Sequence, residues 1–314
     1  MKLRKVIISY IAYKRSLGMR MRNEERVLGF FYNAIGDIEL DRADPQAVLA
    51  FIGDAARPGR WRTYYGVVGS FYRYALERGY AHRSPLPQRS PKFPAQTPPY
   101  IYSTAELKRL LAAAAALSRT CSPLHPDTYR TLLLLLYGSA IRIGEALSLT
   151  LHDVDLAASV LLIRETKFFK TRWVAVGPEL TQSLRDYAER RRSLPLPEGE
   201  HSAFLATRTG RAPCLNDVQT YFRQLRRSAK IHCPDRSARH QPHVHDIRHT
   251  SATHRLTAWY REGKDVQQLL PYLSTYLGHR DLESTRRYLT LTPELLQHAS
   301  DRFRRVLTTE NSHV

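Results

Sequence analysis

Apolar residues in the first part of the chain recur at the spacing of helix faces. The apolar and aromatic residues of 27–35 and of 63–79 each fall on one face of a helix. Another helix opens with the apolar run from Val6 to Tyr13. Asp44, followed by a proline, predicts the N-cap of a short helix from Pro45 to Ile52. The first part of the chain is therefore predicted to be helical.

A proline-rich stretch interrupts this pattern. Six prolines lie between Ser84 and Pro99. Proline lacks an amide donor and restricts the residue before it, so the stretch is predicted to be extended and non-helical. We expect it to be a semi-rigid linker, residues 84–99, between domains 1–83 and 100–314. An ordinary long loop would place the boundary at the same point.

The second part of the chain predicts more helices and one hairpin. Ser103 and Glu106 have the spacing of a capping box, which opens a helix through Ala116. Residues 128–137 are apolar all round, which indicates a buried helix. Two β-rich segments, 160–164 and 173–176, predict a hairpin. Further helices are predicted over residues 178–192, 215–230, 246–260, 266–277 and, after the Thr292-Pro293 cap, 293–307.

The net charge of the chain points to a polyanionic partner. It is +19, from 48 basic and 29 acidic residues. Residues 1–100 hold 17 of the basic and 8 of the acidic residues, so both parts of the chain carry the excess. Such a surplus is typical of proteins that bind nucleic acid, although a smaller excess can serve solubility alone.

Cysteine usage and hydropathy predict a cytoplasmic protein. Cys121, Cys214 and Cys233 are few, odd in number and without paired spacing, which favours a reducing compartment. The longest apolar run, Leu132 to Leu136, is too short to span a bilayer. We therefore expect no membrane partner.

A set of basic and nucleophilic residues suggests phosphodiester chemistry. Two arginines can hold a phosphate through paired donors, and a tyrosine phenol can attack it. A lysine in the hairpin turn can protonate the leaving oxygen, and histidines can bind or exchange protons near neutral pH. The set consists of Arg142, Lys167, His245, Arg248, His279 and Tyr288. No cluster of carboxylates accompanies it, so neither a metal nor a cofactor is expected.

Each member of the set also has a plain structural reading. Arg142 and Glu145 have the spacing of a surface ion pair on a helix. His279, after a glycine, could satisfy carbonyls at a helix end, and Tyr288 could be one of many core tyrosines. Histidines near Cys233 could suggest zinc, but no Cys-x-x-Cys pair supports such a site. The order and spacing of the whole set are what favour the catalytic reading.

In that order and spacing the chain resembles the tyrosine recombinase (phage integrase) family. Residues 140–147, Ala-Ile-Arg-Ile-Gly-Glu-Ala-Leu, look like its first arginine box, and residues 245–250, His-Asp-Ile-Arg-His-Thr, look like its second. Leu277-Gly278-His279 and the nine-residue step to Tyr288 are similar to its last box. The resemblance covers residues from about 103 to 307 closely, and the helical N-terminal part less specifically.

The resemblance implies a fold and an activity. The fold would be mainly α. A helical N-terminal core-binding domain of the SAM-like type would precede an α-rich tyrosine-recombinase catalytic domain with a small antiparallel β-sheet. The activity would be site-specific recombination of double-stranded DNA through a 3′-phosphotyrosine intermediate. It would serve the integration, excision or transposition of a mobile element, in a synaptic tetramer. In such a tetramer the helix 293–307 would dock on a neighbouring protomer; packing of this helix against its own domain is the alternative.

Departures from the family pattern leave choices open. The usual glycine after the hairpin lysine is absent, so Lys170 competes with Lys167 for that role. Ala140 stands where glycine is common. The arginines Arg142 and Arg248 would form a cationic cradle for the phosphate. Glu145 is expected to support this cradle without touching the reacting groups. DNA contacts outside the catalytic set are predicted for Arg57, Arg60, Arg62, Arg172, Arg286 and Arg287.

Two other functions remain as alternatives. A type IB topoisomerase shares the tyrosine chemistry but works as a monomer. A non-catalytic DNA-binding regulator could keep the recombinase fold without the reaction. All six catalytic positions are filled, which counts against the regulator.

Overall fold

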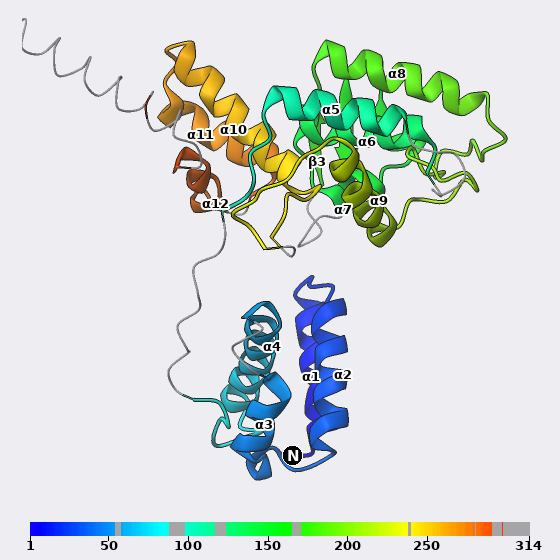
Figure 1. Cartoon of the computed structure of the whole chain (residues 1–314). Helices are drawn as coiled ribbons and strands as arrows, with labels where there is room; N and C mark the ends of the chain where they lie inside the picture. Colours follow the sequence, from blue (N-terminus) through cyan, green and yellow to red (C-terminus); the bar gives the residue numbers. More distant parts are fainter. Residues whose placement is uncertain are drawn as a thin grey trace, which may run out of the picture. The chain divides into compact units, whose positions relative to one another are not determined.

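The computed structural model describes residues 1–53, 58–87, 98–116, 124–164, 171–237, 240–279, 281–290 and 297. The chain divides into two compact units. The first contains residues 1–96, and the second contains residues 97–166 and 171–314. Helices dominate both units, as the sequence predicts (Figure 1).

The first unit is a group of helices around one apolar core. Helices α1, α2 and α4 pack against one another, and α3 packs on α2 and α4. Phe31, Val68 and Phe71 are fully buried between them. The elements are α1 (Leu3–Ser16), α2 (Arg22–Ile35), the 3-10 turn η1 (Leu40–Arg42), α3 (Pro45–Ile52) and α4 (Pro58–Glu77).

Local sequence signals account for the start of α3 and, through a proline that the prediction overlooked, for the start of α4. The Asp44 carboxylate accepts hydrogen bonds from two amides of the first turn of α3, each at 3.2 Å, which confirms the predicted cap. Helix α4 begins at Pro58, five residues before the predicted start at Thr63. Proline suits the first turn of a helix because its missing amide would have had no partner there. Arg60 and Arg62 therefore lie inside α4, not before it as predicted.

The second unit combines helices with a small sheet. Its helices are α5 (Thr104–Ala115), α6 (Pro126–Ser139), α7 (Ile143–Leu147), α8 (Pro178–Arg192), α9 (Leu215–Ser228), α10 (Asp246–Arg261), α11 (Val266–Leu277) and α12 (Glu283–Arg286). The 3-10 turns are η2 (Leu151–Asp153) and η3 (Arg287–Thr290), and the strands are β1 (Val154–Asp155), β2 (Val160–Ile163) and β3 (Arg172–Ala175). This confirms a mainly α fold with a small antiparallel sheet.

Helix α6 is the centre of the second unit. It packs against α5, α8 and α10, three helices that surround it in Figure 1. Its leucines at 132, 133, 135 and 136 are all at most 3% exposed, as expected for a helix that is apolar on most sides. At Gly138 a β-carbon would lie 2.8 Å from Leu180 of α8, so the two helices approach closely there.

The sheet has the order β1-β2-β3, with both pairs antiparallel. Strands β2 and β3 form the predicted hairpin, in which Leu161 pairs with Val174 and both are fully buried. Strand β1 is an addition that the sequence pattern did not predict. Lys167 and Lys170 belong to residues 165–170, which lie outside the described residues.

The last helices bring the C-terminal motifs onto α10. Helix α11 ends at Gly278, which has the left-handed conformation (φ 66°) that favours glycine. Helix α12 follows, and η3 then carries Tyr288 against α10. The predicted helix 293–307 falls outside the described residues except for Gln297. Within the described part of the chain, no helix has the length and hydropathy needed to cross a membrane.

Candidate active site

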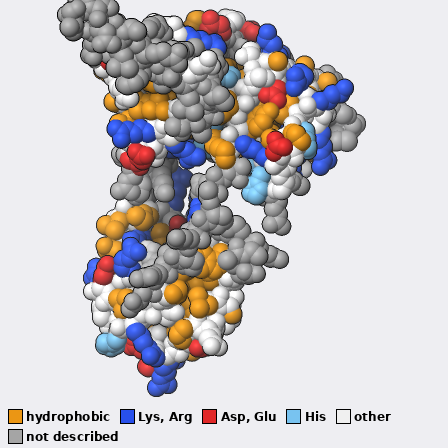
Figure 2. All heavy atoms as spheres, turned by 60° about the vertical axis from the view of Figure 1, so that its left-hand side comes forward, with side chains coloured by type: hydrophobic (Ala, Val, Ile, Leu, Met, Phe, Trp, Pro, Cys, Tyr) orange, Lys and Arg blue, Asp and Glu red, His pale blue; other side chains and the backbone are white. Residues whose placement is uncertain are grey.

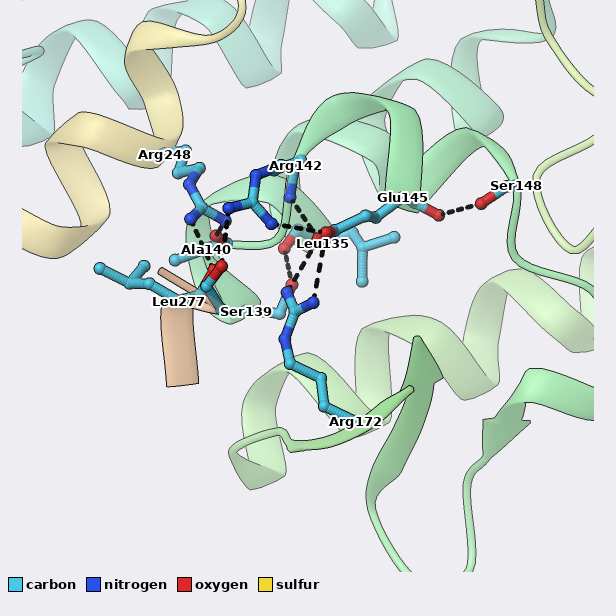
Figure 3. Close-up of polar contacts among 10 residues, drawn as sticks. Leu135, Ser139, Ala140, Arg142, Glu145, Ser148, Arg172, Arg248 and Leu277 are labelled. Atoms are coloured by element: carbon cyan, nitrogen blue, oxygen red, sulfur yellow. Dashed lines mark hydrogen bonds and ion pairs between the residues drawn. The ribbon is translucent and has the colours of Figure 1, made fainter. Parts of the chain in front are cut away.

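Arg142 stands at the junction of α6 and α7. Helix α6 ends at Ala140, whose positive φ of 49° explains why a glycine suits this position. Arg142 is the N-cap of α7, and its Nη1 donates to Glu145 Oε1 at 2.8 Å. Its Nη2 donates to the carbonyl of Gly278, 136 residues further along the chain, at 2.7 Å. The first and last catalytic boxes therefore meet through this side chain (Figure 3).

Arg248 lies on α10 and contacts the C-terminal ends of α6 and α11. Its guanidinium is 2% exposed and donates to the carbonyls of Ala140 and Leu277, the latter at 2.7 Å. Carbonyls at the C-terminal end of a helix carry partial negative charge, which stabilises a nearby cation. Burial and the neighbouring Arg142 lower the pKa of Arg248 to about 10, so it stays charged at neutral pH.

Glu145 holds Arg172 as well as Arg142. Arg172 opens strand β3, and its Nη2 donates to Glu145 Oε2 at 2.8 Å. Burial opposes ionisation of Glu145, but the hydrogen bonds from Arg172 and Arg142 outweigh it and lower its pKa. The Glu145 carboxylate therefore bonds the guanidinium groups of Arg142 and Arg172, while that of Arg248 lies beside Arg142 and is held by carbonyls. The excess positive charge suits a phosphodiester anion.

Gly278 lets Arg172 lie directly against the chain. A β-carbon at this position would lie 2.7 Å from Arg172 Cζ. The same residue offers its carbonyl to Arg142. The positive φ favours glycine here, and a β-carbon would also displace the Arg172 guanidinium from its present position.

Tyr288 is buried beside an imidazole. It is 1% exposed, and its Oη lies 3.0 Å from Nδ1 of His249. Burial raises the pKa of the Tyr288 phenol, and the positive charges of Arg248 and Arg287 oppose that shift only partly. The phenol therefore keeps its proton at neutral pH in the DNA-free protein.

Two further histidines surround the phenol. The His279 ring stacks on the Tyr288 ring with centroids 6.0 Å apart, and its Nδ1 lies 2.7 Å from Thr285 Oγ1. Burial, followed by Arg248 and Arg142, lowers the pKa of His279 to about 4. His245 is exposed at the start of α10, with its ring edge-on to His249 at 4.9 Å. His245, His249 and His279 therefore form a group of imidazoles around the Tyr288 ring.

The structure brings together most of the sequence-predicted set. The residues that converge within the second unit are Arg142, Glu145, Arg172, His245, Arg248, His279 and Tyr288. Lys167, Lys170 and Arg57 lie outside the described residues, so their roles stay predictions.

The predicted DNA contacts are spread over both units. In the first unit the Arg60 guanidinium lies over the Tyr64 ring, 4.7 Å from its centroid, and Arg62 is half-buried. Arg286 and Arg287 are exposed on α12 and η3. Basic side chains appear on the visible faces of both units (Figure 2). Contact of any of these arginines with DNA remains a prediction.

Sequence reasoning missed His249 and Thr285. His249 comes four residues after His245, so helical periodicity places the two on one face of α10. That spacing was the available signal. The contact of Thr285 with His279 had no comparable signal, because it depends on the turn between α11 and α12.

The histidines near Cys233 have other partners. His240 Nδ1 lies 2.8 Å from Ser237 Oγ, and His243 Nδ1 lies 3.2 Å from Asp246 Oδ2. In the described ranges, no three His, Cys, Asp or Glu side chains are grouped so as to hold a metal ion.

Comparison with known proteins places the chain in a family. The model of the phage integrase family matches residues 102–294. An integrase/recombinase of Sinorhizobium fredii named y4rB is 35% identical over 306 residues, covering 96% of this chain and 97% of the relative. A tyrosine recombinase XerC of Chlorobaculum tepidum is 31% identical over 301 residues, covering 86% and 83%. The chain belongs to the phage integrase family.

Solved structures share the fold. The Tn1549 transposon integrase in complex with transposon right end DNA aligns with a TM-score of 0.68 and 14% identity, covering 98% of this chain and 100% of that one. A lambda integrase tetramer bound to a Holliday junction aligns with a TM-score of 0.62 and 14% identity, covering 92% and 77%. At this identity the likeness concerns the fold alone.

Substitution of Gly278 should test the close approach of Arg172. Gly278→Ala and Gly263→Ala both place alanine at a positive φ, which costs about 1–2 kcal/mol in either case. Only Gly278 would also push a β-carbon into a neighbour, since nothing lies within 4 Å of that position at Gly263. We expect the larger loss of unfolding free energy in urea for Gly278→Ala. Equal losses would contradict the packing argument.

The buried histidines should make the fold sensitive to acid. The pKa of His249 and of His279 is about 4 in the folded protein, against an ordinary value of 6.5. Below pH 6.5 these two histidines take up protons in the unfolded chain but not in the folded chain. The free energy of unfolding therefore falls as the pH is lowered from 6.5 towards 4. The double variant His249→Gln, His279→Gln should show a shallower fall in melting temperature between pH 7 and 5. An unchanged slope would show that other groups cause the acid sensitivity.

Proposed function

We propose that this protein cleaves and rejoins DNA strands through a covalent bond between Tyr288 and a 3′ phosphate. As a member of the phage integrase family it is a tyrosine-type site-specific DNA recombinase. The observation that carries the mechanism is the convergence of Arg142 and Arg248 on the carbonyls of residues 277 and 278, with Tyr288 beside Arg248.

The arginines would bind the scissile phosphate. In the transition state, negative charge spreads over the non-bridging oxygens, and guanidinium groups match those oxygens with paired donors. Because their hydrogen bonds to carbonyls already hold the side chains, little reorganisation is needed when the phosphate arrives. Glu145 would fix the orientation of Arg142 and Arg172 without touching the DNA.

The remaining side chains would donate a proton to the leaving group or hydrogen-bond the phosphate. Attack by the Tyr288 oxygen on phosphorus breaks the bond to the 5′ oxygen, which needs a proton as it leaves. We propose Lys167 of the hairpin turn as its donor, with Lys170 as the competing choice. His245 and His279 would hydrogen-bond the phosphate oxygens. Since the phosphotyrosine conserves the bond energy, rejoining would need no nucleotide cofactor.

The positive charge of the chain and its family suggest two partners, duplex DNA and further copies of the protein. We propose that residues 1–83 act as a core-binding domain and residues 100–314 as the catalytic domain, joined by the linker 84–99. Both would bind one DNA duplex, since both carry excess positive charge. A tetramer on two DNA sites would be the recombining assembly, as in the lambda integrase tetramer on a Holliday junction. We propose a cytoplasmic location and the integration, excision or transposition of a mobile element.

Loss of the Tyr288 hydroxyl should abolish the covalent intermediate. Tyr288→Phe keeps the ring in its buried site but cannot attack phosphorus. We expect near-normal DNA affinity and no protein–DNA adduct on denaturing gels, with a nicked suicide duplex made from the DNA that flanks the gene. Tyr272→Phe, an exposed tyrosine on α11, is the matched control and should form adducts normally. An adduct formed by Tyr288→Phe would remove Tyr288 from the mechanism.

Strand cleavage should persist in the presence of EDTA. The guanidinium groups supply the charge stabilisation that a metal ion supplies in other phosphoryl-transfer enzymes. We expect the rate of adduct formation on the suicide duplex to be unchanged by the chelator. Activity lost in EDTA and restored by magnesium would overturn the metal-free mechanism.

A recombination assay would separate the alternatives. A type IB topoisomerase relaxes supercoils as a monomer and does not exchange strands between two sites. A non-catalytic regulator forms no adduct even in its unaltered form. The proposed function requires both an adduct and exchange between two DNA molecules that carry the flanking sites.

A further inference from the structure

The geometry points to His249 as the residue that accepts the proton of Tyr288 during strand cleavage, an inference that rests on the proposed nucleophilic role of Tyr288. His249 directly follows Arg248 on α10, and its side chain is half-buried. Its Nδ1 lies 3.0 Å from the Tyr288 Oη, the atom that would attack phosphorus. His249 therefore touches a reacting atom in the DNA-free protein.

The two neighbouring histidines are less suited to this task. The His279 ring lies nearly parallel to the phenol ring, at an interplanar angle of 16°, so its nitrogens do not point at the phenol oxygen. Its Nδ1 is also engaged with Thr285. His245 is in contact with the His249 ring, edge-on. Of these three imidazoles, His249 is the one with a nitrogen at hydrogen-bonding distance from the nucleophile.

Burial and the charges around His249 keep its imidazole neutral, which is the form that can accept a proton. Its pKa is lowered to about 4 by burial and then by His245, while Arg287 of η3 and Arg248 act in the same direction and Asp246 opposes them. The imidazole is therefore neutral at pH 7. Because the pKa of Tyr288 is raised, the proton stays on the phenol until DNA binds. A phosphate anion held by Arg142 and Arg248 would favour the imidazolium and thus the transfer.

The step balances without another reactant. The phenol O–H bond breaks as the bond from oxygen to phosphorus forms, and the proton passes to Nδ1 of His249. The bond from phosphorus to the 5′ oxygen breaks, and that oxygen takes its proton from the proposed lysine. On rejoining, the 5′ hydroxyl attacks phosphorus and gives its proton back to the lysine, while the Tyr288 oxygen leaves and takes its proton back from His249. Arg248, which also contacts the phenol, would stabilise its developing negative charge.

His249→Asn tests the role with little change in size. Asparagine can keep a polar group near the Nδ1 position but cannot take up a proton. The matched control is His254→Asn on the same helix, where Nδ1 of His254 lies 3.0 Å from the Tyr137 Oη outside the cradle. The measurement is the single-turnover rate of adduct formation on the nicked suicide duplex, at saturating protein and from pH 6 to 9. DNA affinity and melting temperature are measured for each variant.

The expected result is a pH-dependent defect. At pH 7 the rate of His249→Asn should fall by about 10²–10⁴-fold, the usual range for loss of a general base. The defect should shrink as pH rises, because hydroxide then removes the phenol proton. His254→Asn should react at the unaltered rate. A defect that is the same at every pH would reveal a positioning role, and the absence of a defect would remove any role; either result would overturn the inference.

A second substrate and a second variant complete the test. A duplex with sulfur in place of the leaving 5′ oxygen needs no proton donor for that group. It should not rescue His249→Asn, and rescue would assign His249 to the leaving group instead. If His249→Asn melts below the assay temperature, His249→Gln is measured in its place with the same expectations. An adduct formed by Tyr288→Phe would instead refute the proposed function, so the two failures are distinguishable.

Discussion

The site depends on holding three guanidinium groups close together before any phosphate is present. Like charges repel, and in a partly buried site the repulsion is poorly screened. Glu145 accepts hydrogen bonds from Arg142 and Arg172, and the carbonyls of Ala140, Leu277 and Gly278 accept the others. These acceptors belong to the ends of α6 and α11 and to α7. The packing of these helices therefore fixes the positions of the three guanidinium groups.

The acceptors neutralise only part of the positive charge of the three guanidinium groups, and the remaining charge can bind an anionic ligand. A single carboxylate opposes the three cations, and carbonyl dipoles offset only part of the remaining charge. A buried group of this kind contributes little to stability by itself, so the apolar packing around α6 must support it. The remaining positive charge is left for the ligand to neutralise. Burial, and after it the neighbouring charge of Arg142, lowers the pKa of Arg248 to about 10.

Local features of the fold could be predicted from the sequence, while the contacts of the site could not. Helix α3 follows from the Asp44 cap, and the bounds of α11 (Val266–Leu277) match the predicted helix 266–277, which Asp265 caps through the amide of Gln267 at 2.9 Å. The hairpin follows from its β-rich segments. These signals act over a few residues, whereas the bond from Arg248 to Ala140 joins positions 108 apart.

The proposed catalytic residues were predicted from the order of the family's motifs, since no pattern along the chain reveals how they pack. His249 was overlooked for that reason, although it lies inside one of those motifs. His249 lies next to the Tyr288 oxygen because η3 places Tyr288 against α10. That placement follows from the turn after Gly278. The start of α4 was missed for a different reason, because the prediction followed the apolar face from Thr63 onward and did not consider Pro58 as a first-turn residue.

The uncompensated charge of the cradle ties the stability of the fold to the solution around it. Any small oxyanion that enters between Arg142 and Arg248 binds the folded chain and not the unfolded one. By mass action it raises the free energy of unfolding, and it competes with DNA for the same donors. We therefore expect sulfate and inorganic phosphate to stabilise the fold and, at the same concentrations, to slow DNA cleavage.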